Sequence, residues 1–167
     1  VHLYPGDTWD GVTGYEKTSR REIEQTVDYW VGYARRLGVA LWVGEFGCGS
    51  QAFNASGFVY DFLEILESRC LGYAYWTYGF GDVGYFLKTS TGEEKRHITS
   101  LMERINIMAG ATSASENYNP KTGCYRAEVK IGPIGRIVLR IPSRSMKAIP
   151  RSHILSCTPG PESILLN

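Results

Sequence analysis

The sequence predicts an α/β protein with a parallel sheet, followed by a small β-rich module. Over the first ~110 residues, short apolar segments alternate with amphipathic helical segments, the pattern of parallel strands joined by right-handed helical crossovers. Beyond that point the chain becomes small and polar, and two short apolar segments are separated by turn residues, which is typical of antiparallel β structure. We therefore expect two domains, residues 1–111 and 112–167.

Composition excludes several classes of protein. The 167 residues carry 18 basic and 17 acidic side chains, so the net charge of +1 gives no general attraction for nucleic acid. We expect no nucleic-acid partner, and membrane contact only through a lipid substrate. No apolar run approaches the ~20 residues of a membrane span. The chain begins with Val1 and has no signal peptide, so we interpret it as processed or truncated.

The first strand and helix have clear local signals. Residues 1–4 form a short extended segment that Pro5 ends. Ser19 and Glu22 have the spacing of a capping box, and Gly38 stands where a helix C-terminus favours glycine. Between these signals, apolar residues recur at helical spacing: Ile23, Val27, Trp30, Val31, Ala34 and Leu37.

The remaining elements follow in alternation. Residues 39–43 form a continuous apolar run, which predicts a strand buried on both faces. The further expected elements are a helix at 57–69, a strand at 71–77, a helix at 96–108, a turn at 119–123, and β segments at 125–131 and 136–141.

Glu45 is the leading candidate for a catalytic residue. It follows the apolar strand directly, with no helix to cap and no cation adjacent in sequence. The carboxyl ends of the other two strands carry His2 and Tyr4 on the first and Trp76 on the third. In barrels of parallel strands these ends carry the chemistry, so a carboxylate, an imidazole, a phenol and an indole should converge. That set suits a glycosidase.

These motifs resemble the last three strands of glycoside hydrolase family 5. The matching segments are His2-Leu-Tyr4, Trp-Val-Gly-Glu45-Phe-Gly and Tyr-Trp76-Thr. The resemblance implies the C-terminal part of a (β/α)8 TIM barrel, about strands 6–8, from a retaining β-glycosidase that needs no cofactor and no metal. It also implies that Glu45 is the nucleophile and that Trp76 binds the sugar. Tyr4 and His2 would be further catalytic residues, Tyr4 as the hydrogen-bond partner of Glu45 and His2 as a contact of either the substrate or the nucleophile.

The tail is similar to that of the endoglycoceramidase branch of this family. The similarity rests on residues 104–110 and on the Ile-Pro pair at 141–142. It implies a C-terminal module resembling a β-sandwich, and a substrate that is an oligosaccharide, a glucan or a glycosphingolipid.

One half of the expected machinery is missing. The family's acid/base glutamate follows an asparagine at the end of the fourth strand, which lies outside this chain. A retaining glycosidase needs two carboxyl groups ~5–5.5 Å apart. The other glutamates that we considered fall on helices that a barrel places outside: Glu22, Glu24, Glu64 and Glu67. We therefore expect that this chain alone does not hydrolyse glycosides.

Two alternative functions are open. The chain could be a non-catalytic carbohydrate- or lipid-binding fragment, in which aromatic residues bind but nothing is cleaved. Under either function, Trp9, Phe80 and Tyr85 either line a groove for an aglycone or lipid or are ordinary exposed loop residues. Alternatively, residues 47–52 fit the G-x-G-x-x-A pattern of a nucleotide-binding α/β domain, although no helix signal begins at Ser50.

Four further features bear on processing and on partners. Asn54-Ala-Ser56 is either a glycosylation sequon or a helix N-cap, and it is the only hint of an extracellular or lysosomal/secretory location. A disulfide between Cys48 and Cys70 is excluded, because a helix of ~20 Å separates them. The pairing of Cys124 with Cys157 stays open. The basic residues of the tail form either a solvated face or a surface for anionic lipid headgroups: Arg136, Arg140, Arg144, Lys147 and Arg151.

Overall fold

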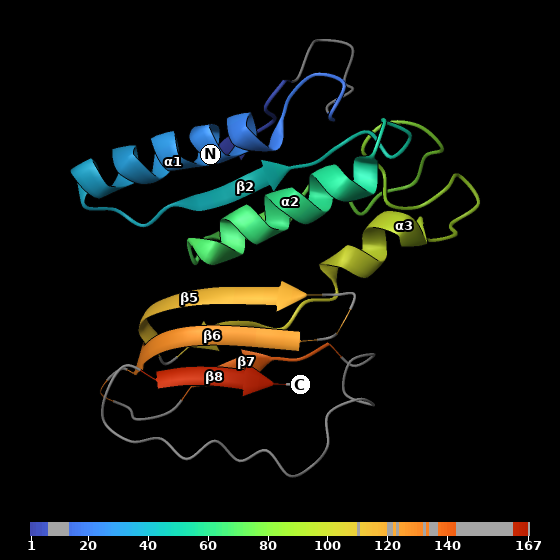
Figure 1. Cartoon of the computed structure of the whole chain (residues 1–167). Coiled ribbons are helices and arrows are strands. Elements are labelled where there is room, and N and C mark those ends of the chain that lie inside the picture. The colour runs from blue at the N-terminus through green and yellow to red at the C-terminus, as the bar shows by residue number, and fades with distance from the viewer. Residues whose placement is uncertain are drawn as a thin grey trace. The chain divides into compact units, whose positions relative to one another are not determined.

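The chain forms two compact units, coloured in chain order in Figure 1. The computed structural model describes residues 1–6, 14–109, 111–119, 122, 124–131, 133, 137–142 and 162–166. The first unit comprises Val1–Leu66 and Leu71–Leu101, and the second comprises Glu67–Cys70 and Met102–Asn167. No helix among the described residues is long and apolar enough to cross a membrane.

The first unit is a parallel sheet with helices (Figure 1). Its elements are β1 (His2–Leu3), α1 (Arg20–Leu37), β2 (Trp42–Phe46), α2 (Ala55–Ser68), β3 (Gly72–Tyr75) and α3 (Arg96–Thr99), followed by a 3₁₀ turn at Ser100–Met102. The strand order is β1-β2-β3, and both neighbouring pairs are parallel. This order confirms the α/β pattern predicted for the first part of the chain.

The capping signals of α1 act as predicted. The Ser19 hydroxyl accepts a hydrogen bond from the Glu22 backbone, and the Glu22 carboxylate accepts one from the Ser19 backbone at 2.8 Å. Gly38 ends the helix with φ +66°, a left-handed conformation that costs glycine little. Leu37 differs from the prediction: it is 59% exposed, because it lies off the stripe of buried residues.

The second strand lies further along the chain than predicted. It begins at Trp42 rather than at residue 39, and both Val39 and Trp42 are exposed. The strand continues through Glu45 to Phe46. Glu45 and Phe46 both pair with β1, and Phe46 also pairs with β3. Glu45 is therefore the penultimate residue of β2, not a loop residue after it.

Aromatic rings fill much of the core of the first unit. Phe46 is fully buried and stacks on Phe62 of α2, with ring centroids 4.7 Å apart. Tyr73 and Tyr75 of β3 contact Phe46 edge-on, so both rings pack within this unit. Full burial of one such side chain stabilises a fold by roughly 1.5–3 kcal/mol, so this cluster anchors β2 in the sheet.

Arg20 joins the two long helices of the first unit. Its guanidinium lies 2.5 Å from Asp61 and 2.9 Å from Glu64, both on α2. Asp61 also accepts a hydrogen bond from Tyr15, and burial raises the pKa of this tyrosine. Glu64 is thus held in an ion pair with α1.

The predicted helix at 96–108 is wrong over its second half. Helical structure ends at Met102, and Asn106–Ala109 is a strand, β4. Its local spacing of apolar residues is compatible with a helix, but hydrogen bonding to β7 (Val138–Arg140) decides the conformation.

The second unit consists of antiparallel strands. β4 pairs with β7, and β5 (Ala111–Asn119), β6 (Cys124–Ile131) and β8 (Glu162–Leu166) form a three-stranded sheet. The predicted segments at 125–131 and 136–141 correspond to β6 and β7, whereas β5 and β8 were not expected. The domain boundary expected at residue 111 falls inside this unit, because β4 already pairs with β7.

A buried ion pair accompanies the core of the second unit. Arg104 is 1% exposed and donates from Nη2 to Glu67 Oε2 at 2.7 Å and to the Tyr118 carbonyl at 3.0 Å. Nearby, the Glu116 carboxylate accepts hydrogen bonds from the Tyr125 hydroxyl and the Ile107 amide, each at 2.6 Å. Burial and the hydrogen bond to Glu116 raise the pKa of Tyr125.

Candidate active site

The first two strands bring three of the predicted site residues together. In the parallel register of β1 and β2, His2 lies opposite Glu45. His2 Nδ1 is 3.2 Å from Glu45 Oε2, and the Tyr4 hydroxyl donates to the same oxygen at 3.1 Å. The Glu45 carboxylate thus contacts two side chains, His2 in β1 and Tyr4 just after β1. Side-chain exposure is 26% for Glu45 and 60% for His2, so the group is open to solvent.

Tyr4 is itself held from a second direction. The ring of Tyr85 meets it edge-on, with centroids 5.5 Å apart. Tyr85 lies in the loop after β3, where its carbonyl accepts a hydrogen bond from the Thr77 amide at 3.2 Å. Tyr85 therefore supports the residue that bonds Glu45. A role for Tyr85 in an aglycone or lipid groove stays an open alternative.

Trp76 directly follows β3, and its side chain is exposed. Its backbone amide donates to the Phe46 carbonyl at 2.8 Å, which ties it to the residue after Glu45. The side chain is 49% exposed, and the peptide bond between Trp76 and Thr77 is cis. Trp76 is thus accessible to solvent, as a residue that stacks on a sugar must be.

Gly47 allows this close approach of strand ends. A Cβ atom built on Gly47 would lie 2.4 Å from the Trp76 carbonyl oxygen and 3.1 Å from the Tyr85 ring. Any other residue would push the loop after β2 away from the loop after β3. In the sequence, Gly47 belongs to the glycosidase-like segment and to the nucleotide-binding pattern, and neither pattern predicts this packing role.

Other exposed aromatic residues surround Lys88. Its ammonium lies 4.4 Å from the ring centroid of Tyr78 and 5.0 Å from that of Phe80. Tyr78 also donates to Glu94 at 3.1 Å, so it is not a core residue. Trp9, the third residue of the expected aglycone groove, lies outside the described residues.

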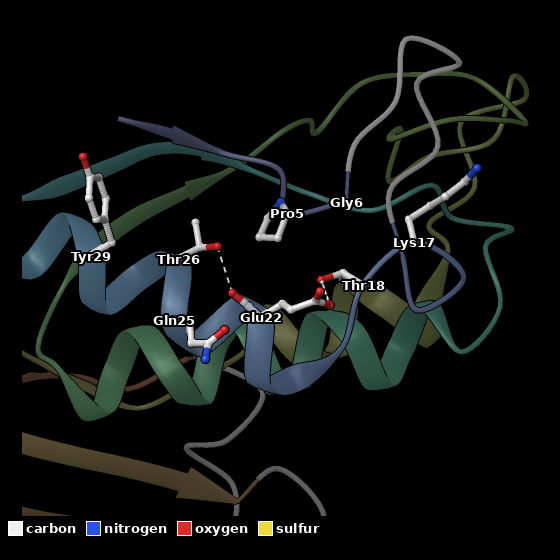
Figure 2. Close-up of a pocket in the computed structure, with 8 residues that line it drawn as sticks. All are labelled: Pro5, Gly6, Lys17, Thr18, Glu22, Gln25, Thr26 and Tyr29. Atoms are coloured by element: carbon white, nitrogen blue, oxygen red, sulfur yellow. Dashed lines mark hydrogen bonds between the residues drawn. The ribbon is translucent and has the colours of Figure 1, made fainter.

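The hollow of Figure 2 does not coincide with Glu45. A cavity of about 460 Å³ lies between the segment after β1 and the first half of α1 (Figure 2). Pro5, Lys17 and Tyr29 are among its lining residues, and none of the four predicted site residues is. The one carboxylate in the cavity lining, that of Glu22, accepts the hydrogen bond from the Ser19 amide that caps α1. We therefore take the Glu45 group, and not this cavity, as the candidate active site.

Cys48 and Tyr75 join the end of β3 to the segment after β2. The Tyr75 hydroxyl donates to the Cys48 carbonyl at 3.0 Å. Burial raises the pKa of the Cys48 thiol to about 12 and also raises the pKa of Tyr75. Both groups therefore stay protonated at neutral pH and serve as structural groups. Cys157 lies outside the described residues, so its pairing with Cys124 stays open.

Neither a metal site nor a nucleotide site emerges from the described segments. Across them, no three His, Cys, Asp or Glu side chains gather as metal ligands. The pattern at residues 47–52 does not open a helix, since α2 begins only at Ala55. A dinucleotide site needs that helix N-terminus at the glycine turn, so the nucleotide-binding alternative lacks its structural basis.

Asn54 and the basic tail keep their open interpretations. Asn54 directly precedes α2, is exposed and has φ +50°, unlike the extended backbone of an ordinary N-cap residue. Its glycosylation remains a prediction. Arg140 is exposed on β7, and the other four basic residues of the tail lie outside the described residues.

Comparisons with known proteins give one consistent likeness. No protein-family model and no curated protein sequence matches the chain. Solved structures of endo-glycoceramidase II from Rhodococcus sp. do match. A complex with a cellobiose-like imidazole aligns with a TM-score of 0.65 at 18% identity, covering 86% of this chain and 32% of that protein. The lactosyl-enzyme intermediate aligns with a TM-score of 0.61 at 16% identity, covering 75% and 30%.

This likeness concerns the fold. At 16–18% identity it shows a mixed α/β structure that resembles part of a glycoside hydrolase barrel. The chain spans about a third of the length of the structures that it matches.

Proposed function

We propose that this chain is the C-terminal part of a retaining β-glycosidase, comprising about strands 6–8 of a (β/α)8 barrel and a module resembling a β-sandwich. The observation that carries the proposal is the Glu45 carboxylate at the end of β2, held on one oxygen by Tyr4 and His2. The fold likeness to a glycosidase supports it.

Glu45 acts as the nucleophile in this proposal. Both observed contacts are to Oε2, so Oε1 is the oxygen that attacks the anomeric carbon. The C–O bond to the leaving group breaks, a glycosyl-enzyme ester forms on Glu45, and water then cleaves that ester. Tyr4 and His2 fix the direction of the attacking oxygen, and no metal or organic cofactor takes part.

A neutral carbohydrate is the proposed substrate. Trp76 offers its exposed ring as a platform for a sugar face. The Rhodococcus protein has been solved with lactosyl and cellobiose-like ligands, which agrees with β-linked sugars. Within that class we propose a glucan or a glycosphingolipid, and an extracellular or lysosomal/secretory location.

The proposed reaction needs a second carboxyl group from outside this chain. That group protonates the leaving oxygen and must lie ~5–5.5 Å from Glu45. Three of the four helical glutamates considered above have other roles: Glu22 caps α1, Glu64 pairs with Arg20, and Glu67 pairs with Arg104. We therefore propose that the chain alone is inactive and that a longer protein contains it within a complete barrel.

The test is Glu45→Gln in that longer protein, assayed with an aryl β-glycoside. Turnover should fall by about 10³-fold or more, because the amide cannot act as the nucleophile. The matched control is Glu64→Gln on α2, which should retain most activity. Full activity in Glu45→Gln would overturn the proposal.

The second candidate is sugar binding without hydrolysis. It is favoured by the exposed position of Trp76 and by the other roles of Glu22, Glu64 and Glu67, which leave none of these three carboxylates to act with Glu45. Calorimetry of this chain with cellobiose, alone and as Trp76→Ala, tests it. Binding that depends on Trp76, together with inactivity of the longer protein, would favour this candidate over the first.

A further inference from the structure

Lys95 connects the two loops that leave the carboxyl ends of β2 and β3. Its ammonium donates to Ser50 Oγ at 2.8 Å, to the Gly81 carbonyl at 2.7 Å and to the Asp82 carbonyl at 3.2 Å. A lysine ammonium has three hydrogens to donate, so the three acceptors match its capacity. Ser50 belongs to the loop after the strand of Glu45, and the two carbonyls belong to the loop after Trp76.

Ser50, one of the three acceptors of Lys95, is itself held by other hydrogen bonds. It is 6% exposed, and each of its polar atoms is engaged. Its amide donates to the Gly84 carbonyl at 2.8 Å, and its carbonyl lies 3.0 Å from His97 Nε2. The hydroxyl is left for Lys95. Gly84 belongs to the loop after β3, so Ser50 is bonded to that loop both through its own amide and through Lys95.

That loop leads by direct contacts to the candidate nucleophile. It carries Tyr85, whose ring meets Tyr4 edge-on at 5.5 Å. Tyr4 in turn donates to Glu45 at 3.1 Å. Movement of the loop after β3 therefore shifts Tyr85, removes the lateral support of Tyr4 and changes the direction of the carboxylate.

The chemistry of Lys95 agrees with an ammonium held by protein acceptors. Burial lowers its pKa below the ordinary value of 10.5, and the charge of Asp82 opposes that change. The group has thus lost part of its hydration shell and has replaced water with oxygen acceptors from the two loops.

We propose that Lys95 is a positioning residue: by holding the loop after β2 to the loop after β3, it keeps Trp76 and, through Tyr85, Tyr4 in place beside Glu45. The role of Lys95 in positioning the nucleophile rests on the function proposed above. The role of Lys95 in joining the two loops does not depend on that function, and a separate experiment tests it.

The first test measures hydrogen exchange in the whole 167-residue chain. Lys95→Met should accelerate exchange at least ~10-fold at the amides that hold these loops, since it removes charge-assisted hydrogen bonds. Those amides are Ser50, which bonds to Gly84 in the other loop, and Thr77 and Leu87, which bond within the loop after β3. The amides in the middle of α1 should not change. The matched control is Lys88→Met, which removes the same charge from the same loop but leaves the connection intact.

A double-mutant cycle separates the connection from general stability. Ser50→Ala should accelerate the same amides by a smaller factor and should add little in the Lys95→Met background, because the two groups act together. Unchanged exchange in Lys95→Met, acceleration spread evenly over the first unit, or additive effects of the two substitutions would each overturn the connection.

The second test addresses positioning. In the longer protein, Lys95→Met should lower kcat more than it changes KM, because a displaced nucleophile weakens transition-state stabilisation. Lys88→Met should leave both constants unchanged at an equal thermal midpoint. A change in KM alone, or unchanged kinetics, would contradict positioning. Retained activity in Glu45→Gln would instead overturn the proposed function, while the exchange result still decides the connection.

Discussion

The Tyr4 hydroxyl donates a hydrogen bond to Glu45 Oε2 across 3.1 Å, joining residues that are 41 positions apart in the sequence. His2, directly opposite Glu45 in the strand register, approaches the same oxygen. One oxygen of the Glu45 carboxylate thus contacts both His2 in β1 and Tyr4 just after it.

Removal of the Tyr4 hydroxyl should weaken catalysis in the longer protein. A hydrogen bond to a charged group contributes ~1.5–3 kcal/mol, so Tyr4→Phe should lower kcat by about 10- to 100-fold at an unchanged thermal midpoint. Tyr33→Phe, at an exposed position on α1, is the control. Steady-state kinetics with an aryl β-glycoside measure the effect, and equal kcat values for the two variants would exclude a role for this bond.

Gly47→Ala should destabilise the first unit. The new Cβ would lie 2.4 Å from the Trp76 carbonyl oxygen, so the backbone of one loop must move. We expect a loss of ~1–3 kcal/mol in the free energy of unfolding. The control is Gly32→Ala within α1, where the nearest atom is the tip of Arg36 at 3.8 Å. There alanine should stabilise by up to ~1 kcal/mol. Urea denaturation measures both, and effects of the same sign would contradict the close approach at Gly47.

The buried pair of Arg104 and Glu67 should be costly to break. Arg104→Met leaves a carboxylate buried without its cation, so the second unit should lose ~3–5 kcal/mol. Arg96→Met, which breaks an exposed pair with Glu94, should cost less than ~1 kcal/mol.

Hydrogen exchange of the amides in β5 and β6 measures this loss. The double variant Glu67→Leu with Arg104→Met should recover most of it, because no charge is left buried. Equal protection of these strands in the two arginine variants would count against the buried pair.

Asp82 should make the loop after β3 sensitive to acid. Hydrogen bonds from the Ser90 amide at 2.9 Å and hydroxyl at 2.7 Å hold the pKa of Asp82 below its ordinary value of 3.8. The charged form is therefore favoured by folding. Its contribution is fully present above pH 3.8 and is lost as the pH falls through the folded value.

Unfolding free energies of wild type and Asp82→Asn, measured from pH 6 downward, check this. The difference should be largest near pH 6 and should shrink below pH 3.8, while Glu93→Gln at an exposed position shows little difference throughout. A difference in the free energy of unfolding between wild type and Asp82→Asn that does not change with pH would contradict a stabilising role for the charged Asp82.

Local patterns predicted much of the first unit. The capping box at Ser19 and the glycine at residue 38 located both ends of α1, since both signals act within one helical turn. The convergence of His2, Tyr4 and Glu45 also followed from sequence, because parallel strands in register bring their carboxyl ends together.

Tertiary contacts decided what local patterns could not. Asn106–Ala109 has apolar spacing compatible with a helix but pairs with β7, a segment about 30 residues further on. Lys95 gave no signal in the sequence, since its acceptors lie in two irregular loops, 45 and 14 residues away. The packing role of Gly47 could not be predicted, because only the packed loops show that the Trp76 carbonyl and the Tyr85 ring lie against it.

The most direct test of the central claim is covalent trapping of the nucleophile. The longer protein is treated with a 2,4-dinitrophenyl 2-deoxy-2-fluoro-β-glycoside, whose leaving group needs no protonation and whose fluorine slows hydrolysis of the ester. Peptide mass spectrometry should then find the fluorosugar on Glu45, and Glu45→Gln should remain unlabelled. Labelling of a different carboxylate, or turnover without any labelled residue, would contradict the assignment of Glu45 as the nucleophile of a retaining glycosidase.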